Sequence, residues 1–185
     1  KIFYETWCVP GNMVISVSGD ADQDAIIKMV SDKLMELKDS DLPKIEIPPP
    51  QPERSQGMTQ IEMNKEESLL LVGYRTPGIQ SEDRFPLEVL SSIVSGSDGR
   101  LNTMVRERSG LSYSLGCALS AGLDAGYLVF YIATTGEDLA PSKERLIEVL
   151  RSLRRNGVTA SEIALAKKRI AGDTLSGMQT NGFVA

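Results

Sequence analysis

The chain has 185 residues and a formal net charge of −5, and this length is sufficient for one hydrophobic core. Its 41% apolar and 24% charged residues are ordinary for a globular protein. We expect no nucleic-acid partner, because the charge balance is acidic and aromatic residues make up only 5%. The sequence contains no apolar run of about 18 residues, so it predicts no membrane span.

The absence of histidine is the most informative count in the sequence. It rules out Ser-His-Asp and Cys-His catalysis within this chain, together with the usual zinc motifs, which need histidine or a cysteine cluster. Cys8 and Cys117 each lie among apolar neighbours, so we expect two buried thiols. We therefore expect no cofactor and no metal in this chain.

The N-terminal region predicts a strand followed by a helix. The chain begins at Lys1 without a methionine and soon enters an apolar segment, so we expect a single domain over residues 1–185 that is a fragment of a longer protein. Targeting signals would lie in the missing part, and no compartment is predicted. Residues 12–20 alternate apolar with smaller side chains and predict a strand. Asp20 or Asp22 is placed to cap the next helix, whose apolar stripe lies within residues 25–37.

Residues 42–56 form a proline-rich connection. Five prolines lie between Pro43 and Glu53, which disfavours a helix and favours an extended strap. The alternative interpretation of this strap is a docking motif for an SH3-type domain. After it, residues 58–65 and 68–77 predict two strands. The second strand is apolar on both faces, so we expect it in the centre of a sheet.

The second half of the chain alternates helix pairs with strand pairs. A helix that Ser81 can cap is followed by the glycine-rich break at residues 95–99, a second helix and a stop at Gly110. Residues 113–121 and 125–135 predict strands, and two further helices close the chain. Thr159 and Glu162 form a capping box for the last helix. This order predicts an α+β fold with one largely antiparallel or mixed sheet and helices packed on one face.

One stretch carries a resemblance to a known family. It reads SGSDGRLNTMVRERSGLSYSLGCALSA, and it resembles the second, zinc-free domain of the pitrilysin/insulinase family of inverted-motif zinc metallopeptidases. Family members typically carry a glycine-rich turn, then Ser-Arg-Leu, then Val-Arg-Glu-x-x-Gly-Leu-Ala-Tyr-Ser. Gly99 stands here where the family usually has Ser, and Ser112 where it usually has Ala or Gly. WCVPGNMVISVSGDAD and NGVTASEIALAKKRIAGD resemble two further family blocks in the same order.

The resemblance implies a division of labour between two domains. Zinc and the general base would lie in a missing N-terminal domain, and this chain would bind extended peptide and contribute Arg106 and Tyr113 to the cleft. A phenol hydrogen and a guanidinium can stabilise the negative charge that develops on a carbonyl oxygen during amide hydrolysis. The implied partners are a peptide or unfolded protein substrate and the zinc-bearing domain or subunit.

Arg106 and Tyr113 also have a purely structural interpretation. An arginine near a helix C-terminus is favourable against the helix dipole whatever its function, and a tyrosine at the start of a strand is often a half-buried wall residue. Arg108 is the competing arginine, two residues further along the helix.

Three functions stay open at this point. The chain is the zinc-free domain of a zinc-dependent peptidase, or a non-catalytic partner subunit or scaffold of such a peptidase, or a structural fragment. In each case we expect residues 1–185 alone to bind no zinc and to have no peptidase activity.

Overall fold

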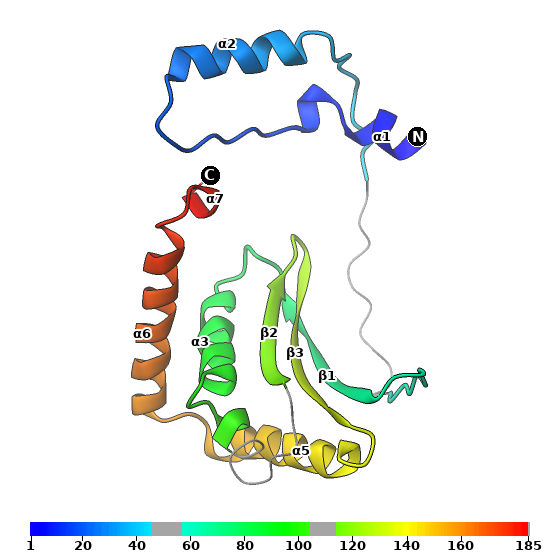
Figure 1. Cartoon of the computed structure of the whole chain (residues 1–185), viewed down its shortest axis with the longest axis vertical. Coiled ribbons are helices and arrows are strands. Elements are labelled where there is room, and N and C mark those ends of the chain that lie inside the picture. The colour runs from blue at the N-terminus through cyan, green and yellow to red at the C-terminus, as the bar shows by residue number, and fades with distance from the viewer. Residues whose placement is uncertain (46–56, 104–113, 185) are drawn as a thin grey trace. The chain divides into compact units, whose positions relative to one another are not determined.

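The computed structural model describes residues 1–45, 57–103 and 114–184 (Figure 1). Arg106 and Tyr113 lie outside the described residues, as does most of the proline-rich connection. The chain divides into two compact units, Lys1–Gln51 with Thr174–Ala185, and Pro52–Asp173. The expectation of a single domain over residues 1–185 stays a prediction.

The second unit contains a three-stranded antiparallel sheet in the order β1-β3-β2. The strands are β1 (Glu67–Pro77), β2 (Ser114–Ala121) and β3 (Ala125–Thr135). β2 and β3 form a hairpin closed at residues 122–124, where Gly122 N donates to the carbonyl of Ala125 at 3.2 Å. The sheet and its helices confirm the predicted α+β class.

The position of β1 in this sheet corrects one prediction. Its apolar run predicts a central strand, but β3 is central among the described strands and β1 is at an edge. Leu70 and Val72 face the core, whereas Leu69 and Leu71 on the opposite face are 61% and 57% exposed. A run that is apolar on both faces therefore does not identify a central strand here, because one of its faces carries no covering layer in this unit.

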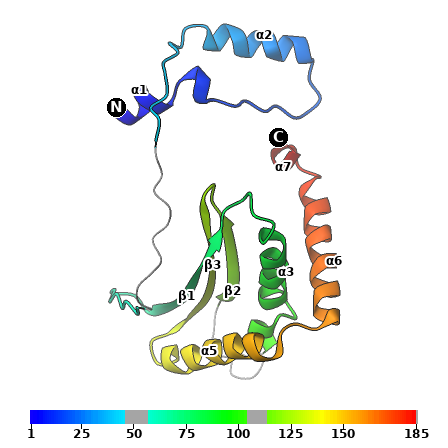
Figure 2. The ribbon, with the colours of Figure 1, turned by 180° about the vertical axis from the view of Figure 1, so that it is seen from behind.

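Helices cover one face of the sheet. α3 (Arg84–Ser95) runs alongside β2, and α5 (Leu139–Asn156) crosses one end of the sheet, as both ribbon views show (Figures 1 and 2). Burial of apolar area at about 25 cal/mol per Å² is the main stabilising contribution to such a core. The core cluster joins these helices to the inner face of β2 and β3, and its buried members are Val94, Leu101, Cys117, Leu128, Phe130, Ile132, Leu146 and Val149.

The first unit contains helices and a segment without strand pairing. Its elements are α1 (Ile2–Trp7), the 3-10 turn η1 (Pro10–Asn12), α2 (Gln23–Leu34) and α7 (Asn181–Val184). The N-cap of α2 confirms one prediction, because the Asp22 carboxylate accepts a hydrogen bond from Ala25 N at 2.8 Å. α6 (Ala160–Gly177) begins in the second unit and ends in the first.

Two predicted strands are absent from the described residues. Residues 13–18 and 58–65 are assigned to no strand, and their apolar side chains remain exposed, Val14 at 97% and Ile61 at 78%. Alternation alone does not make a strand, because the backbone groups of a strand need a neighbouring strand as hydrogen-bond partner. No helix in the described part of the chain is long and apolar enough to cross a membrane.

Candidate functional site

Arg106 and Tyr113 belong to residues 104–113. The described residues on either side of this segment show how its two ends are held. On the N-terminal side, Leu101 is completely buried in the core cluster. Thr103 N donates to the carbonyl of Gly99 at 3.0 Å, and Thr103 Oγ1 donates to the same oxygen at 3.2 Å. Residues 100–103 are helical and are tied both to the core and to the turn before them.

That turn joins α3 to the helical residues 100–103. Gly99 N donates to the carbonyl of Gly96 at 2.7 Å, and Asn102 Nδ2 donates to the same carbonyl at 2.8 Å. A Cβ at Gly99 would collide with the carbonyl oxygen of Val94, so the turn needs glycine there. This lack of space explains why Gly99 stands here where the family usually has Ser.

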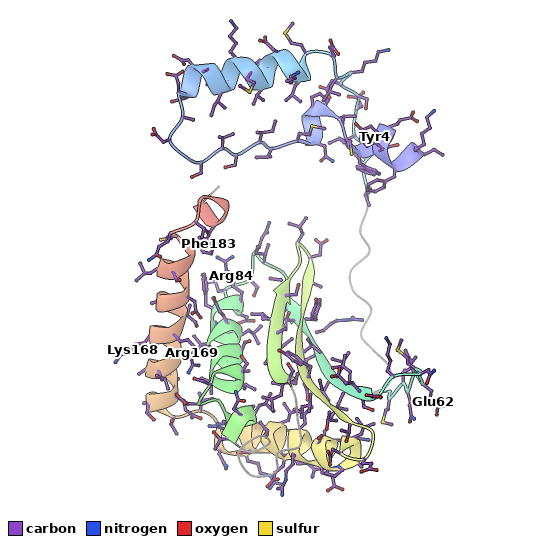
Figure 3. The ribbon with its side chains drawn as sticks, viewed as in Figure 1. Tyr4, Glu62, Arg84, Lys168, Arg169 and Phe183 are labelled. Carbon is purple, nitrogen blue, oxygen red and sulfur yellow. The ribbon has the colours of Figure 1, made fainter. Side chains whose placement is uncertain are left out.

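Arg169 of α6 also contacts this turn, at Gly96. It lies between α6 and α3, whereas its neighbour Lys168 points away from α3 (Figure 3). Arg169 Nη1 donates to the carbonyl of Ser92 at 2.8 Å, and its guanidinium fills the space in which a side chain at Gly96 would lie. A guanidinium on the last carbonyls of α3 is favourable against the helix dipole.

Arg100 connects the start of the helical residues to α6. Its Nε and Nη2 donate to the two carboxylate oxygens of Glu162 at 2.6 and 2.8 Å. Nη2 also donates to the carbonyl of Gly157, the residue after α5, at 2.8 Å. The side chains of Arg100 and Glu162 are 18% and 28% exposed. This bidentate geometry is the strongest form of an arginine–carboxylate contact and also the most directional.

Glu162 caps the start of α6 in addition to binding Arg100. Its carboxylate accepts from Thr159 N at 2.7 Å, and Glu162 N donates to Thr159 Oγ1 at 3.3 Å, which confirms the predicted capping box. The Arg100 hydrogen bonds, together with those of Thr159, lower the pKa of Glu162 to about 2 against the opposing effect of burial. The same contact raises the pKa of Arg100. The pair is therefore ionised throughout the neutral and mildly acidic range.

On the C-terminal side, β2 begins directly after Tyr113. Ser114 pairs with Ala133 of β3, and the register continues to Ala121 opposite Gly126. No described strand pairs with the other edge of β2. An edge strand of this kind offers backbone groups to which an extended peptide can add, although the Cys117 carbonyl of β2 already accepts from Ser91 Oγ of α3 at 3.1 Å.

The described residues do not fit a zinc site. The sequence contains no histidine, and the described residues hold no group of three or more Cys, Asp or Glu side chains that could bind a metal ion. Of the two thiols, Cys117 is buried as predicted, and burial, opposed by a contact with Ser91, raises its pKa to about 11. The prediction of a buried thiol is wrong for Cys8, which is only partly buried.

A groove of about 480 Å³ in the first unit is a weaker candidate. It lies between residues 15–19 and α2, and its lining carries no titratable side chain. Perturbed ionisable groups in a cleft are the usual sign of a catalytic site, and this groove has none. Its lining residues are Ile15, Val17, Gly19, Ala21, Gln23, Ile26, Ile27, Val30 and Ser31.

The structure adds two arginines for which the sequence predicted no role, Arg100 and Arg169. Local spacing predicted the Thr159–Glu162 cap because its partners are three residues apart. It could not predict the contact between Arg100 and Glu162, which are 62 residues apart. The available signal was that Arg100 occupies the arginine of the family's Ser-Arg-Leu block.

Residues 1–170 match the family described as "Peptidase M16 inactive domain". An uncharacterized zinc protease of Mycobacterium leprae is 30% identical over 178 residues, which is 92% of this chain and 39% of that protein. An uncharacterized zinc protease of Mycobacterium tuberculosis is 30% identical over 182 residues, 92% of this chain and 40% of that protein. The chain thus spans about two fifths of the length of these relatives.

Solved structures share the fold. A protease from Helicobacter pylori matches with a TM-score of 0.78 at 18% identity, over 100% of this chain and 46% of that one. A peptidase M16 inactive domain from Pseudomonas fluorescens matches with a TM-score of 0.69 at 22% identity, over 83% of this chain and 37% of that one.

Proposed function

Because the chain belongs to the family of peptidase M16 inactive domains, we propose that it is the zinc-free domain of a zinc-dependent peptidase and that it contributes to peptide hydrolysis from outside the zinc site. The observation that carries this proposal is the family match over residues 1–170, together with 30% identical relatives that are zinc proteases and are more than twice as long. Zinc and the general base come from the part of the protein beyond this chain.

Arg106 and Tyr113 are the residues through which this domain acts. Hydrolysis of an amide places negative charge on the carbonyl oxygen, and a donor already oriented toward that oxygen lowers the barrier. The Tyr113 hydroxyl donates one hydrogen bond to this oxygen, and the Arg106 guanidinium supplies positive charge and holds a neighbouring peptide carbonyl. Neither residue needs to change its protonation state during the reaction.

Extended peptide binds along the free edge of β2. The support is that β2 pairs with β3 on one side only among the described strands, and that its first residue, Ser114, follows Tyr113 directly. A peptide that adds to this edge uses main-chain hydrogen bonds and so tolerates many sequences. The proposal assigns contact with the scissile carbonyl to Tyr113, the residue before the strand.

Substitutions in the full-length protein test this proposal. We expect Tyr113→Phe and Arg106→Ala each to lower kcat for peptide cleavage by about 100- to 1000-fold, the usual effect of removing one oxyanion donor. Arg108→Ala is the matched control in the same segment, and we expect it to change kcat by no more than about twofold, as ordinary surface substitutions do. Unchanged kcat in both Tyr113→Phe and Arg106→Ala would instead indicate a domain that serves only assembly or scaffolding.

A further inference from the structure

Residues 13–18 of the first unit form an extended segment without a partner strand among the described residues. Met13, at its start, has the extended backbone angles φ −112° and ψ 137°. No backbone–backbone hydrogen bond joins residues 14–18 to another described residue. The segment runs beside α2 in both ribbon views (Figures 1 and 2). Its backbone donors and acceptors therefore remain available to another strand.

Side-chain hydrogen bonds hold this segment at both ends. Before it, Gly11 N donates to Asp39 Oδ1 at 3.2 Å, and Asn12 Nδ2 donates to the carbonyl of Trp7 at 2.9 Å. After it, the Asp22 carboxylate caps α2. Because Asp39 follows α2 in the chain, its contact with Gly11 ties the two ends of this strap-and-helix arrangement together. An extended segment that is anchored in this way loses less entropy when a partner binds it.

The side chains of the segment and of α2 form an apolar groove that no described residue covers. Ile15 and Val17 are 51% and 56% exposed, and together with Ile26 and Val30 of α2 they line the groove of about 480 Å³. α2 contains no buried residue, and Val9 is the only buried hydrophobic side chain among the described residues of the first unit. One extended segment and one helix with so little buried apolar surface lack the main stabilising contribution to a folded unit.

The partner that fits this surface is a strand with apolar neighbours in the same polypeptide. Unpaired backbone groups are matched by a strand, and an apolar groove is matched by apolar side chains. The chain covers only 39% and 40% of the length of the curated relatives, so a larger part of such a protein lies outside the matched region. A partner in the same polypeptide has an effective concentration of about a millimolar, which exceeds that of a second copy in dilute solution.

We propose that residues 13–18 add as a strand to the edge of a sheet in the part of the full-length protein outside residues 1–185. Apolar side chains of that sheet fill the groove beside Ile15, Val17 and α2. Under the proposed function this part carries the zinc site, but the inference concerns a folding contact and requires no catalytic role. The first unit then stabilises a part of the protein that lies beyond this chain.

Amide hydrogen exchange of residues 13–18 tests this contact in the full-length protein and in residues 1–185 alone. We expect exchange to be at least about 100-fold slower in the full-length protein, because strand hydrogen bonds protect these amides only there. Equally fast exchange in both proteins overturns the inference. Slow exchange in residues 1–185 alone also overturns it, because the partner then lies within this chain or, where protection rises with protein concentration, in a second copy.

A substitution in the groove gives a second test. In the full-length protein we expect Val17→Asp to lower the unfolding midpoint by about 5 °C or more, since the new carboxylate is buried without a partner. In residues 1–185 alone the same change should shift the midpoint by less than about 2 °C, because Val17 is exposed there. Equal shifts in the two proteins would contradict the inference.

Ile2→Asp on α1 is the matched control for this substitution. Ile2 is 82% exposed and does not line the groove, so we expect a shift below about 2 °C in both proteins. Where Val17→Asp prevents folding of the full-length protein, exchange in the unchanged protein still decides the question.

The outcome is separable from that of the proposed function. If residues 13–18 are protected only in the full-length protein while Arg106→Ala and Tyr113→Phe leave kcat unchanged, the inference stands and the proposed function fails. If these two variants lower kcat but exchange is equally fast in both proteins, the inference fails and the proposed function stands.

Discussion

At the residue scale, Glu162 takes part in two interactions through one carboxylate. It completes the capping box of α6 with Thr159, and it binds Arg100 through both of its oxygens. Because the charged form is favoured by these donors, its pKa falls from the ordinary 4.5 to about 2. A carboxyl group whose pKa is lower in the folded state stabilises that state above its unfolded pKa and loses this contribution as pH falls toward the folded value.

The resulting prediction concerns the free energy of unfolding of Glu162→Gln as a function of pH. At pH 7 we expect the variant to be about 1–2 kcal/mol less stable, since a partly exposed charged hydrogen bond is lost while the cap is kept. The difference should shrink as pH falls from 4.5 to 2, because Glu162 becomes protonated in that window. Denaturant titrations at several pH values measure it, with Glu148→Gln as control, and a pH-independent difference would contradict the account.

A second prediction at this scale concerns the thiols. Burial raises the pKa of Cys117 to about 11, so little thiolate is present at pH 8, whereas Cys8 is only partly buried. We expect iodoacetamide to label Cys8 well before Cys117 in the folded protein, and both at similar rates in urea. Mass spectrometry of tryptic peptides reports the order, and equal labelling in the folded protein would show that Cys117 is accessible.

At the scale of elements, local and long-range features were not equally predictable. The caps of α2 and α6 were predicted correctly, because both partners of each contact lie within one helical turn. The cap predicted at Ser81 is wrong, because α3 begins at Arg84 after Asp83 and has no side-chain cap. Strands at residues 12–20 and 58–65 were predicted wrongly, since a strand depends on a distant partner that alternation does not reveal. The Arg100–Glu162 contact was missed for the same reason, and Arg106 and Tyr113 came from the resemblance rather than from spacing.

The turn between α3 and the helical residues 100–103 gives a prediction at this scale. Gly99→Ala should destabilise the chain by about 1–3 kcal/mol, because the new Cβ meets the backbone carbonyl of Val94, which has to shift. Gly172→Ala within α6 is the matched control, since no atom lies within 4 Å of its added Cβ. We expect that change to stabilise the helix by about 0.5–1 kcal/mol. Thermal unfolding of both variants tests the difference, and similar effects in the two would refute the steric argument.

At the scale of the whole molecule, the second unit has a defined core, and the described residues hold no cluster that could bind a metal ion. The second unit buries its apolar side chains between the sheet, α3 and α5, whereas the opposite face of β1 and β3 exposes Leu69, Leu71 and Tyr127. With no histidine in the sequence and no metal-binding cluster in the described ranges, we expect residues 1–185 alone to bind no zinc. Elemental analysis of the purified chain tests this, and one zinc per chain would contradict it.

The central claim is that this domain contributes to a reaction whose metal lies elsewhere in the protein. The most direct test is the cleavage rate of an unfolded peptide by the full-length protein, by the protein lacking residues 1–185, and by the latter after separately prepared residues 1–185 are added. We expect deletion to lower the rate by at least about 100-fold, since oxyanion donors are lost, and addition to restore part of it. An unchanged rate after deletion would show that the domain has no part in the chemistry.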